Sequence, residues 1–318
     1  MMSTAHTTKR VTYETCDVFT TQCFGGNPLA VVFDAEHLSD ATLQKIAAEF
    51  NYSEITFVLP PSDPQNTARV RIFTPVTEYP FAGHPNVGTA AVLAQRGPMC
   101  FGKPLGSTLR FEEGAGVVPL DLIFDEESHE PVGAMLTAPE PWRIEQPEMP
   151  VADVAACLGL DASDVCAANH KPLVATAGLP FGIVELSSYD ALQRSRGQPS
   201  VCAKLEHEPW WPPRGRFHAY VRPDAANDAD GADIRCRMHR QNGTEDAGTG
   251  SANCALLGLL ASLAPSPGTL QARIVQGVEM GRPSLLQGEA TTDADGVVRS
   301  VRIGGRCVPV SRGEFVSL

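Results

Sequence analysis

The chain of 318 residues has little positive charge. Lys and Arg number 25 against 37 Asp and Glu, which gives a formal net charge of −12. No cluster of basic residues is longer than the pair Lys9-Arg10, so the basic patch that nucleic-acid binding requires is missing. We therefore expect no nucleic-acid partner.

Long hydrophobic runs are also missing. The longest apolar stretch, residues 255–264, is interrupted by Gly258 and Ser262 and is about half of the roughly 20 residues that a bilayer span needs. Residues 1–10 are polar and lack the apolar core of a signal peptide. We expect no membrane association and a cytoplasmic location.

The pairs of residues that usually hold metals or disulfides do not occur. The nine cysteines include no C-x-x-C spacing, and the eight histidines include no H-x-H or H-E-x-x-H pair. Such scattered thiols are typical of a protein from a reducing compartment. The sequence therefore predicts neither a disulfide framework nor a metal site.

Glycine and proline are plentiful, at 28 and 26 residues, which indicates many turns and hence many strands. Hydrophobic residues make up 43% of the chain, an ordinary value for a globular protein. At about 150 residues per domain, the length indicates two domains. We expect a strand-rich α/β or α+β chain.

The first half of the chain alternates strand and helix patterns, and residues 126–131 are expected to link two domains. A helix should begin at Ser39 or Asp40, and another should cover residues 87–93 with Pro85 at its first position. Strands are expected at residues 11–20, 28–33, 54–59, 69–73 and 107–124, the first two joined by a turn at 25–27.

The second half repeats this plan. Helices are expected at residues 151–158, capped by Gly159, and at 251–263. Strands are expected at 172–186, broken at Gly178 and Pro180, and at 216–222 and 233–239. The tail from residue 269 to the end should be strand-like, with turns at Gly281, Gly288 and Gly304-Gly305.

The two halves share one arrangement of strand, small-residue loop and apolar helix. The loop is Ala82-Gly83-His84-Pro85 in the first half and Ala247-Gly248-Thr249-Gly250 in the second. The two loops are about 165 residues apart, too far for a solenoid repeat and suitable for two similar domains. We therefore expect two similar α+β domains, residues 1–128 and 129–306, with residues 307–318 packing back on the first.

A small-residue loop that leads into a helix presents free backbone N–H groups, and these bind anions together with the helix dipole. Two such loops facing each other would hold one small anionic substrate. For a single glycine loop the simpler interpretation is a tight turn. The prediction of an anion site therefore depends on the occurrence of Gly83 in one half and of Gly248 and Gly250 in the other.

Three ionisable residues accompany these loops: His84, Asp246 and Glu54. Each also has a plain structural interpretation, as a hydrogen-bonded histidine, a turn residue and a solvated connector respectively. In a shared site, His84 would be an acid/base candidate and Asp246 a carboxylate able to orient it. Glu54 precedes an apolar strand, and a carboxylate against apolar surface suits proton transfer.

A set of motifs in chain order resembles the phenazine-biosynthesis PhzF family. These motifs are Asp17-Val18-Phe19, Gly25-Gly26-Asn27-Pro28, Asn51-Tyr52-Ser53-Glu54, Arg71-Ile72-Phe73-Thr74-Pro75, Glu78-Tyr79-Pro80-Phe81-Ala82-Gly83-His84-Pro85 and Glu245-Asp246-Ala247-Gly248-Thr249-Gly250-Ser251, with Gln276-Gly277 and Gly281-Arg282-Pro283-Ser284. Each motif is weak alone, but the set covers nearly the whole chain.

The resemblance implies a diaminopimelate-epimerase-like fold, in which each of two domains is a β-sheet wrapped around a central helix and the active site lies between them. It also implies a homodimer and an isomerase that moves a proton by acid/base catalysis without cofactor or metal. The substrate would be a small carboxylate, such as a dihydro-hydroxyanthranilate.

The resemblance also implies roles for individual residues. Glu54, His84 and Asp246 would be catalytic, with Glu54 as the acid/base. The substrate-binding residues would be Asn27, Gly83, Thr249, Gly250 and Ser251. Two positions depart from the usual family pattern: Ala247-Gly248 replaces a pair that begins with proline, and Asn86 replaces a threonine.

Two alternative functions follow from the same residues. Racemases and epimerases of this fold use one cysteine at each loop, but this chain has Ala82 and Ala247 there, and alanine cannot carry a proton. The other alternative is a small-molecule binding protein that kept the site without the reaction, because the altered Ala247-Gly248 loop changes the backbone at the site.

Overall fold

The computed structural model describes residues 10–146, 148–222, 231–264 and 266–316. Residues 1–9, whose polar character was used above, and residues 317–318 of the predicted tail lie outside this description.

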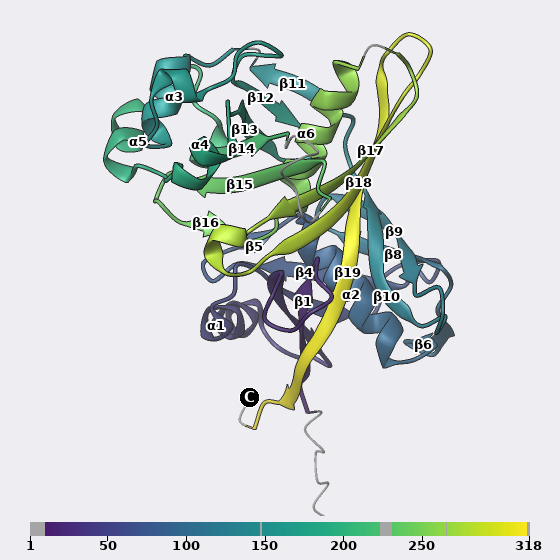
Figure 1. The fold of residues 1–318 in the computed structure, drawn as a ribbon. Helices are drawn as coiled ribbons and strands as arrows, with labels where there is room; N and C mark the ends of the chain where they lie inside the picture. The colour runs from purple at the N-terminus through teal and green to yellow at the C-terminus, as the bar shows by residue number, and fades with distance from the viewer. Residues whose placement is uncertain (1–9, 147, 223–230, 265, 317–318) are drawn as a thin grey trace, which may run out of the picture.

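The chain forms two lobes (Figure 1). The first lobe contains β1 (Thr12–Val18), β2 (Asn27–Phe33), α1 (Asp40–Phe50), β3 (Ile55–Leu59), β4 (Ala68–Phe73), β5 (Glu78–Tyr79), α2 (Gly83–Arg96), β6 (Met99–Cys100), β7 (Lys103–Pro104), β8 (Thr108–Glu113), β9 (Gly116–Phe124) and β10 (Pro131–Thr137).

The second lobe contains most of the remaining chain and carries the helices α3 to α6 (Figure 1). Its elements are β11 (Arg143–Gln146), α3 (Val151–Cys157), η1 (Ala162–Asp164), β12 (Leu173–Thr176), β13 (Pro180–Glu185), α4 (Tyr189–Arg194), α5 (Pro199–Leu205), η2 (Pro213–Gly215), β14 (Arg216–Val221), β15 (Ile234–Arg240), β16 (Glu245–Asp246), α6 (Gly250–Ser262), β17 (Thr269–Gln276), η3 (Val278–Met280) and β18 (Ser284–Thr292).

The last strand, β19 (Val298–Glu314), connects the lobes. It pairs antiparallel with β18 in the second lobe and with β10 and β1 in the first. Figure 1 shows it as a long yellow arrow from the junction to the far end of the first lobe. Residues 307–314 therefore add a strand to the first lobe beside β1.

The two apolar helices lie in the interior. Every residue from Gly83 to Leu93 in α2 is buried, and α2 packs against β1, β2, β9, β10 and β19. In α6 the buried residues run from Ala252 to Ala261, and the helix packs against β12, β13, β17, β18 and β19. Because these parts of both helices are buried on all sides, packing against the surrounding strands holds each of them in place.

Several sequence predictions are confirmed in detail. Strands β1 and β2 form the expected antiparallel hairpin. Its turn requires glycine at Gly26, whose φ is +60° and where a Cβ would lie 2.2 Å from the Val18 carbonyl oxygen. The first helix begins after Ser39, whose hydroxyl accepts a hydrogen bond from the Thr42 N–H, so Ser39 and not Asp40 is the N-cap.

The start of α2 differs from the prediction. The helix begins at Gly83, so Pro85 is its third residue and not its first. Proline is still tolerated there, because the N–H groups of the first turn have no partner within the helix. The side-chain amide of Asn86 donates to the Ala82 carbonyl oxygen over 3.1 Å and so closes this turn.

Two of the turns predicted in the tail are wrong, since Gly288 lies inside β18 and Gly304-Gly305 inside β19. These glycines serve close packing. A Cβ on Gly288 would lie 2.2 Å from Leu257 of α6, and one on Gly304 would lie 2.1 Å from the Ala134 carbonyl oxygen of β10. The absence of side chains allows β18 and β19 to approach the helix and the neighbouring strand.

The segment 126–131, expected as a domain linker, is the turn of the hairpin between β9 and β10. The Asp125 N–H donates to the Glu130 carbonyl oxygen over 2.9 Å and closes it. Because β10 packs on α2, it belongs with the first lobe.

No helix in the described part of the chain is long and apolar enough to cross a membrane. All nine cysteines are free thiols, and eight of them are buried or half-buried; Cys23 is exposed.

Candidate active site

The beginnings of α2 and α6 meet at the junction of the lobes. A Cβ on Gly83 would lie 3.1 Å from the backbone nitrogen of Ser251 and 3.3 Å from the Cα of Gly250. The structure thus brings together the two loops that the repeat singled out. Because both helices begin here, both helix dipoles contribute positive potential at this place.

His84 lies in the first turn of α2 and is 4% exposed. Its Nδ1 atom is 3.8 Å from Oε2 of Glu54 and 3.4 Å from the Asn27 amide nitrogen. Burial lowers the pKa of His84 from its ordinary value, although the negative charges of Glu54 and Asp246 act in the opposite sense. The imidazole is therefore neutral at pH 7, and its Nε2 atom has no hydrogen-bond partner among the described residues.

Asn27, at the start of β2, connects the two loops. Its side-chain amide donates to Oδ1 of Asp246 over 2.9 Å and to the Gly248 carbonyl oxygen over 3.0 Å. Its carbonyl oxygen accepts a hydrogen bond from the Ser53 hydroxyl over 3.3 Å. One residue of the first lobe thereby fixes the acidic loop of the second lobe beside His84.

Asp246 is 8% exposed and held from its own lobe as well. The Thr249 hydroxyl donates to its Oδ2 atom over 2.7 Å. The Gln276 side chain donates to the Asp246 carbonyl oxygen over 2.8 Å and accepts a hydrogen bond from the Thr249 N–H over 3.1 Å. Gln276 is thus a supporting residue to which the sequence alone gave no role, because its partners lie 27 and 30 residues away.

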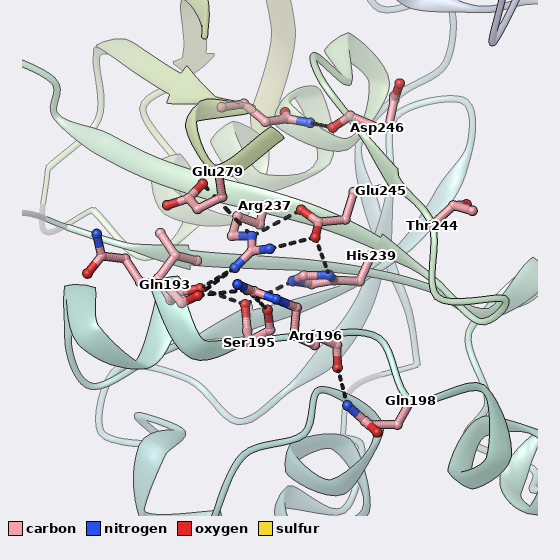
Figure 2. A network of polar contacts seen from close by, with 12 residues as sticks. Gln193, Ser195, Arg196, Gln198, Arg237, His239, Thr244, Glu245, Asp246 and Glu279 are labelled. Atoms are coloured by element: carbon pink, nitrogen blue, oxygen red, sulfur yellow. Dashed lines mark hydrogen bonds and ion pairs between the residues drawn. The ribbon is translucent and has the colours of Figure 1, made fainter. Parts of the chain in front are cut away.

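A buried network holds Glu245, the residue before Asp246 (Figure 2). Arg237 is 2% exposed and donates to both oxygens of Glu245, over 3.0 and 2.5 Å. It also donates to the carbonyl oxygens of Leu192 and Gln193 at the end of α4. This charge-assisted fork fixes the short strand β16 and with it the backbone of Asp246.

The same network contains Ser195, His239 and Glu245 in an order that resembles a nucleophilic triad. The Ser195 hydroxyl lies 2.9 Å from Nε2 of His239, and Nδ1 of His239 lies 3.8 Å from Glu245 (Figure 2). Ser195 is 0% and His239 1% exposed, so no substrate reaches them. Burial lowers the pKa of His239 to about 3, which keeps it neutral, and the group is structural.

The departure at Ala247-Gly248 has a structural counterpart. A Cβ on Gly248 would lie 2.7 Å from the Ser284 hydroxyl and 3.0 Å from the Phe19 ring. The loop therefore packs more closely on these residues than a larger residue at position 248 would allow. Of the remaining predicted binding residues, Thr249 is the N-cap of α6, and Gly250 and Ser251 are its first two residues.

Neither loop carries a thiol. Ala82 and Ala247 are buried at the two loop positions, and Cys254 lies one turn into α6. Burial raises the pKa of Cys254 to about 12, so this thiol is not a base at neutral pH. Among the described residues no three His, Cys, Asp or Glu side chains are grouped as metal ligands would be.

Comparison with known proteins supports this picture. The model of the PhzC-PhzF family, described as phenazine biosynthesis-like protein, matches residues 16–313. An uncharacterised isomerase of Mesorhizobium japonicum is 36% identical over 94% of this chain and 96% of its own. The trans-2,3-dihydro-3-hydroxyanthranilate isomerase of Pseudomonas chlororaphis is 33% identical over 96% of this chain and 99% of its own.

Solved structures agree on a mixed α+β fold in which sheets dominate two domains. A PhzF-family protein of Bacillus anthracis superposes with a TM-score of 0.81 at 22% identity, over 97% of this chain and 99% of that one. A hydroxyproline epimerase of Agrobacterium vitis superposes with a TM-score of 0.61 at 12% identity, over 96% and 92% of the two chains. The fold prediction is confirmed at this level.

Proposed function

Because this chain is an isomerase of the phenazine biosynthesis-like (PhzF) family, we propose that it moves a proton within a small carboxylate-bearing substrate by general acid/base catalysis. One observation carries the proposal. The Glu54 carboxylate lies 3.8 Å from the neutral His84 imidazole, where the N-termini of the two buried helices meet.

Glu54 is the proton carrier in this proposal. Its side chain is 12% exposed, so its carboxylate can contact a small substrate while water has little access. Acid/base catalysis needs a group that accepts a proton from one carbon and returns it to another without leaving the site. Glu54 sits immediately before β3, a fixed strand, which holds it in one place for both steps.

His84 and Asp246 assist. The Asn27 amide contacts His84 Nδ1 and Asp246 Oδ1, so the orientation of the imidazole depends on the acidic loop. A neutral imidazole can donate or accept a proton, and its buried Nε2 atom has no hydrogen-bond partner among the described residues. The paired helix N-termini offer N–H donors to the negative charge that develops when a carbon loses its proton.

The names of the relatives support the substrate class that we propose. Relatives from Pseudomonas chlororaphis, Pseudomonas fluorescens and Pseudomonas aeruginosa are each named trans-2,3-dihydro-3-hydroxyanthranilate isomerase. A cyclic dihydro-hydroxyanthranilate-like acid is therefore the first substrate to try. The proposal includes catalysis without cofactor or metal, and assembly as a homodimer.

The test is proton exchange in deuterated water. The purified protein is incubated in D₂O with trans-2,3-dihydro-3-hydroxyanthranilate, and isomerisation and deuterium incorporation are followed by NMR and mass spectrometry. We expect turnover with deuterium at the carbon that gains the proton. Stabilisation of the protein by this ligand without any chemistry would instead support the binding-protein alternative. Inversion at a stereocentre of a tested amino acid would support the epimerase alternative.

A further inference from the structure

Two arginines of the second lobe lie beside the candidate acid/base groups, and nothing in the family motifs includes them. Arg216 begins β14 and Arg240 ends β15, and the two residues face each other directly in the antiparallel pair. Side chains at such opposite positions share one face of the sheet. Two like charges there are unfavourable unless an anion lies between them.

Their surroundings place both arginines at the site. Nη2 of Arg240 lies 3.9 Å from Oδ1 of Asp246, and its charge also acts on His84. Arg216 donates a hydrogen bond of 3.4 Å to the Tyr79 hydroxyl of the first lobe, and the Glu54 carboxylate is near enough to stabilise its charge. The two guanidinium groups thus face the same junction as Glu54, His84 and Asp246.

Arg216 is half-buried, yet no carboxylate of the described residues lies within 4.0 Å of it. Other half-buried or buried arginines have such partners: Arg71 pairs with Glu78, Arg237 with Glu245 and Arg282 with Asp17. Burial, reinforced by the charges of Arg214 and Arg240, lowers the pKa of Arg216 from its ordinary value. A cation in this position gains from an incoming anion.

The Arg216 side chain is also held in a fixed orientation. Its guanidinium carbon lies 5.5 Å from the centre of the Phe181 ring, and the neighbouring Arg214 stacks 4.8 Å from the Tyr79 ring. A fixed planar guanidinium suits a planar carboxylate, because two parallel N–H groups match its two oxygens. A lysine in the same place would provide a point charge without this geometry.

We propose that Arg216 and Arg240 bind the carboxylate of the substrate, while the N–H groups of the two helices face the charge that develops during proton transfer. This inference rests on the proposed function and adds to it separate roles for the two arginines and for the helix N–H groups. It also predicts specificity: the enzyme selects ring compounds with a free carboxylate and rejects their amides, although amides have the same shape.

A pair of ligands of the same shape tests the proposal without any turnover. The dissociation constants of 2-aminobenzoate and 2-aminobenzamide are measured by isothermal titration calorimetry for the wild type and for Arg216→Gln, Arg216→Lys, Arg240→Gln and the control Arg143→Gln. Arg143 lies on β11, pairs with Glu140 and Glu145, and is 51% exposed. Far-UV circular dichroism and thermal unfolding check that each variant is folded.

We expect the wild type and Arg143→Gln to bind the carboxylate roughly 10- to 100-fold more tightly than the amide, as charged hydrogen bonds predict. Arg216→Gln and Arg240→Gln should each reduce this ratio at least tenfold, and Arg216→Lys should retain part of it. If Arg216→Gln fails to fold, Arg240→Gln and Arg216→Lys give the same comparison.

Equal affinity of the wild type for the two ligands, including the absence of binding to both, would overturn the proposal, as would a wild-type ratio in Arg216→Gln and Arg240→Gln. The variant Glu54→Gln separates this result from the proposed function. It should keep the preference for the carboxylate and lose deuterium exchange. A preserved preference together with undiminished exchange in Glu54→Gln would refute the role of Glu54 and leave the arginine subsite standing.

Discussion

The Asn27 side-chain amide donates a hydrogen bond of 2.9 Å to the carboxylate of Asp246, 219 residues later in the chain. This contact joins the first strand hairpin of one lobe to the loop that leads into α6 of the other. Because both residues are buried, the bond is shielded from water. It fixes the distance between His84 and the acidic loop.

Replacing Asn27 by alanine should lower both stability and activity. Asp246 Oδ1 and the Gly248 carbonyl oxygen lose a donor, which costs about 1–3 kcal/mol in the free energy of unfolding for buried groups. Urea unfolding and the deuterium-exchange rate measure the two effects. The control is Asn66→Ala, which removes an amide–carboxylate bond to Glu112 that is not part of the candidate site. Asn66→Ala should lose stability and keep its activity. If the two variants lost activity equally, this would contradict the role of Asn27.

Glu54→Gln should reduce turnover by roughly 10²–10⁴, the range for a lost general acid/base, and should leave the fold intact. Glutamine keeps the shape of the side chain but cannot accept the proton. Initial rates of isomerisation and deuterium incorporation are compared with those of Glu49→Gln, the same change on the exposed side of α1. Full activity of Glu54→Gln on a verified substrate would assign the proton transfer to another residue.

Gly83→Ala should reduce turnover by roughly tenfold with little change in unfolding temperature. The new Cβ would lie 3.1 Å from the Ser251 nitrogen, so the two helix N-termini must move apart by a few tenths of an ångström. Small displacements of catalytic donors have large effects on rate. Gly106→Ala, where a Cβ meets nothing closer than 3.8 Å, is the matched control. A Gly83→Ala enzyme as active as this control would show that the approach of the helices is not needed.

Lowering the pH below about 6.5 should already destabilise the protein, at pH values above the range in which carboxylates titrate. Burial lowers the pKa of His218 to about 4 and that of His239 to about 3, against roughly 6.5 for an unfolded histidine. The unfolded chain binds the extra protons, so stability falls as the pH drops below 6.5 towards the folded values. At pH 5 the loss is roughly 2 kcal/mol for each of the two histidines.

The urea concentration at the midpoint of unfolding, measured between pH 7 and pH 5, gives this dependence. His218→Gln keeps a donor for the Oδ1 atom of Asn253 and should flatten the curve, whereas His207→Gln, on the surface, should not. Parallel curves for the wild type and His218→Gln would show that His218 does not bind the extra proton on unfolding.

Iodoacetamide should leave turnover largely unchanged while it modifies the exposed Cys23. Burial raises the pKa of both Cys254 and Cys307 to about 12, so these thiols do not react at neutral pH. Peptide mass spectrometry counts the modified sites beside the rate measurement. Loss of activity in step with the modification of one cysteine would restore the thiol-based racemase alternative.

The parts of the fold that depend on local chemistry were predictable from the sequence. Residues that are close together in the sequence determine the Ser39 cap, the Gly25-Gly26 turn and the two apolar helices. The structure confirms all of them. Glycines in strands were harder to interpret. Gly288 and Gly304 leave room for partners that are distant in the sequence, and a local pattern does not distinguish this from a turn.

The same distinction applies to the site. Glu54, His84, Asp246 and Asn27 were singled out because each lies in a motif, and the structure brings them together. Arg216 and Arg240 lie in no motif, and they meet only through the register of β14 and β15. Arg237 likewise reaches Glu245 from the neighbouring strand. Strand register is set by the whole sheet, so these residues could not be found from sequence alone.

The position of β19 has a consequence for protein synthesis. Domains usually fold in order as the ribosome releases them, but β1 of this protein pairs with residues 307–314, which emerge only after the elements of the second lobe. Until then one edge of β1 has no partner, and an uncovered edge is prone to pair with other chains. The first lobe is therefore completed only after the elements of the second lobe have been synthesised, and truncation before β19 should impair the first lobe as much as the second.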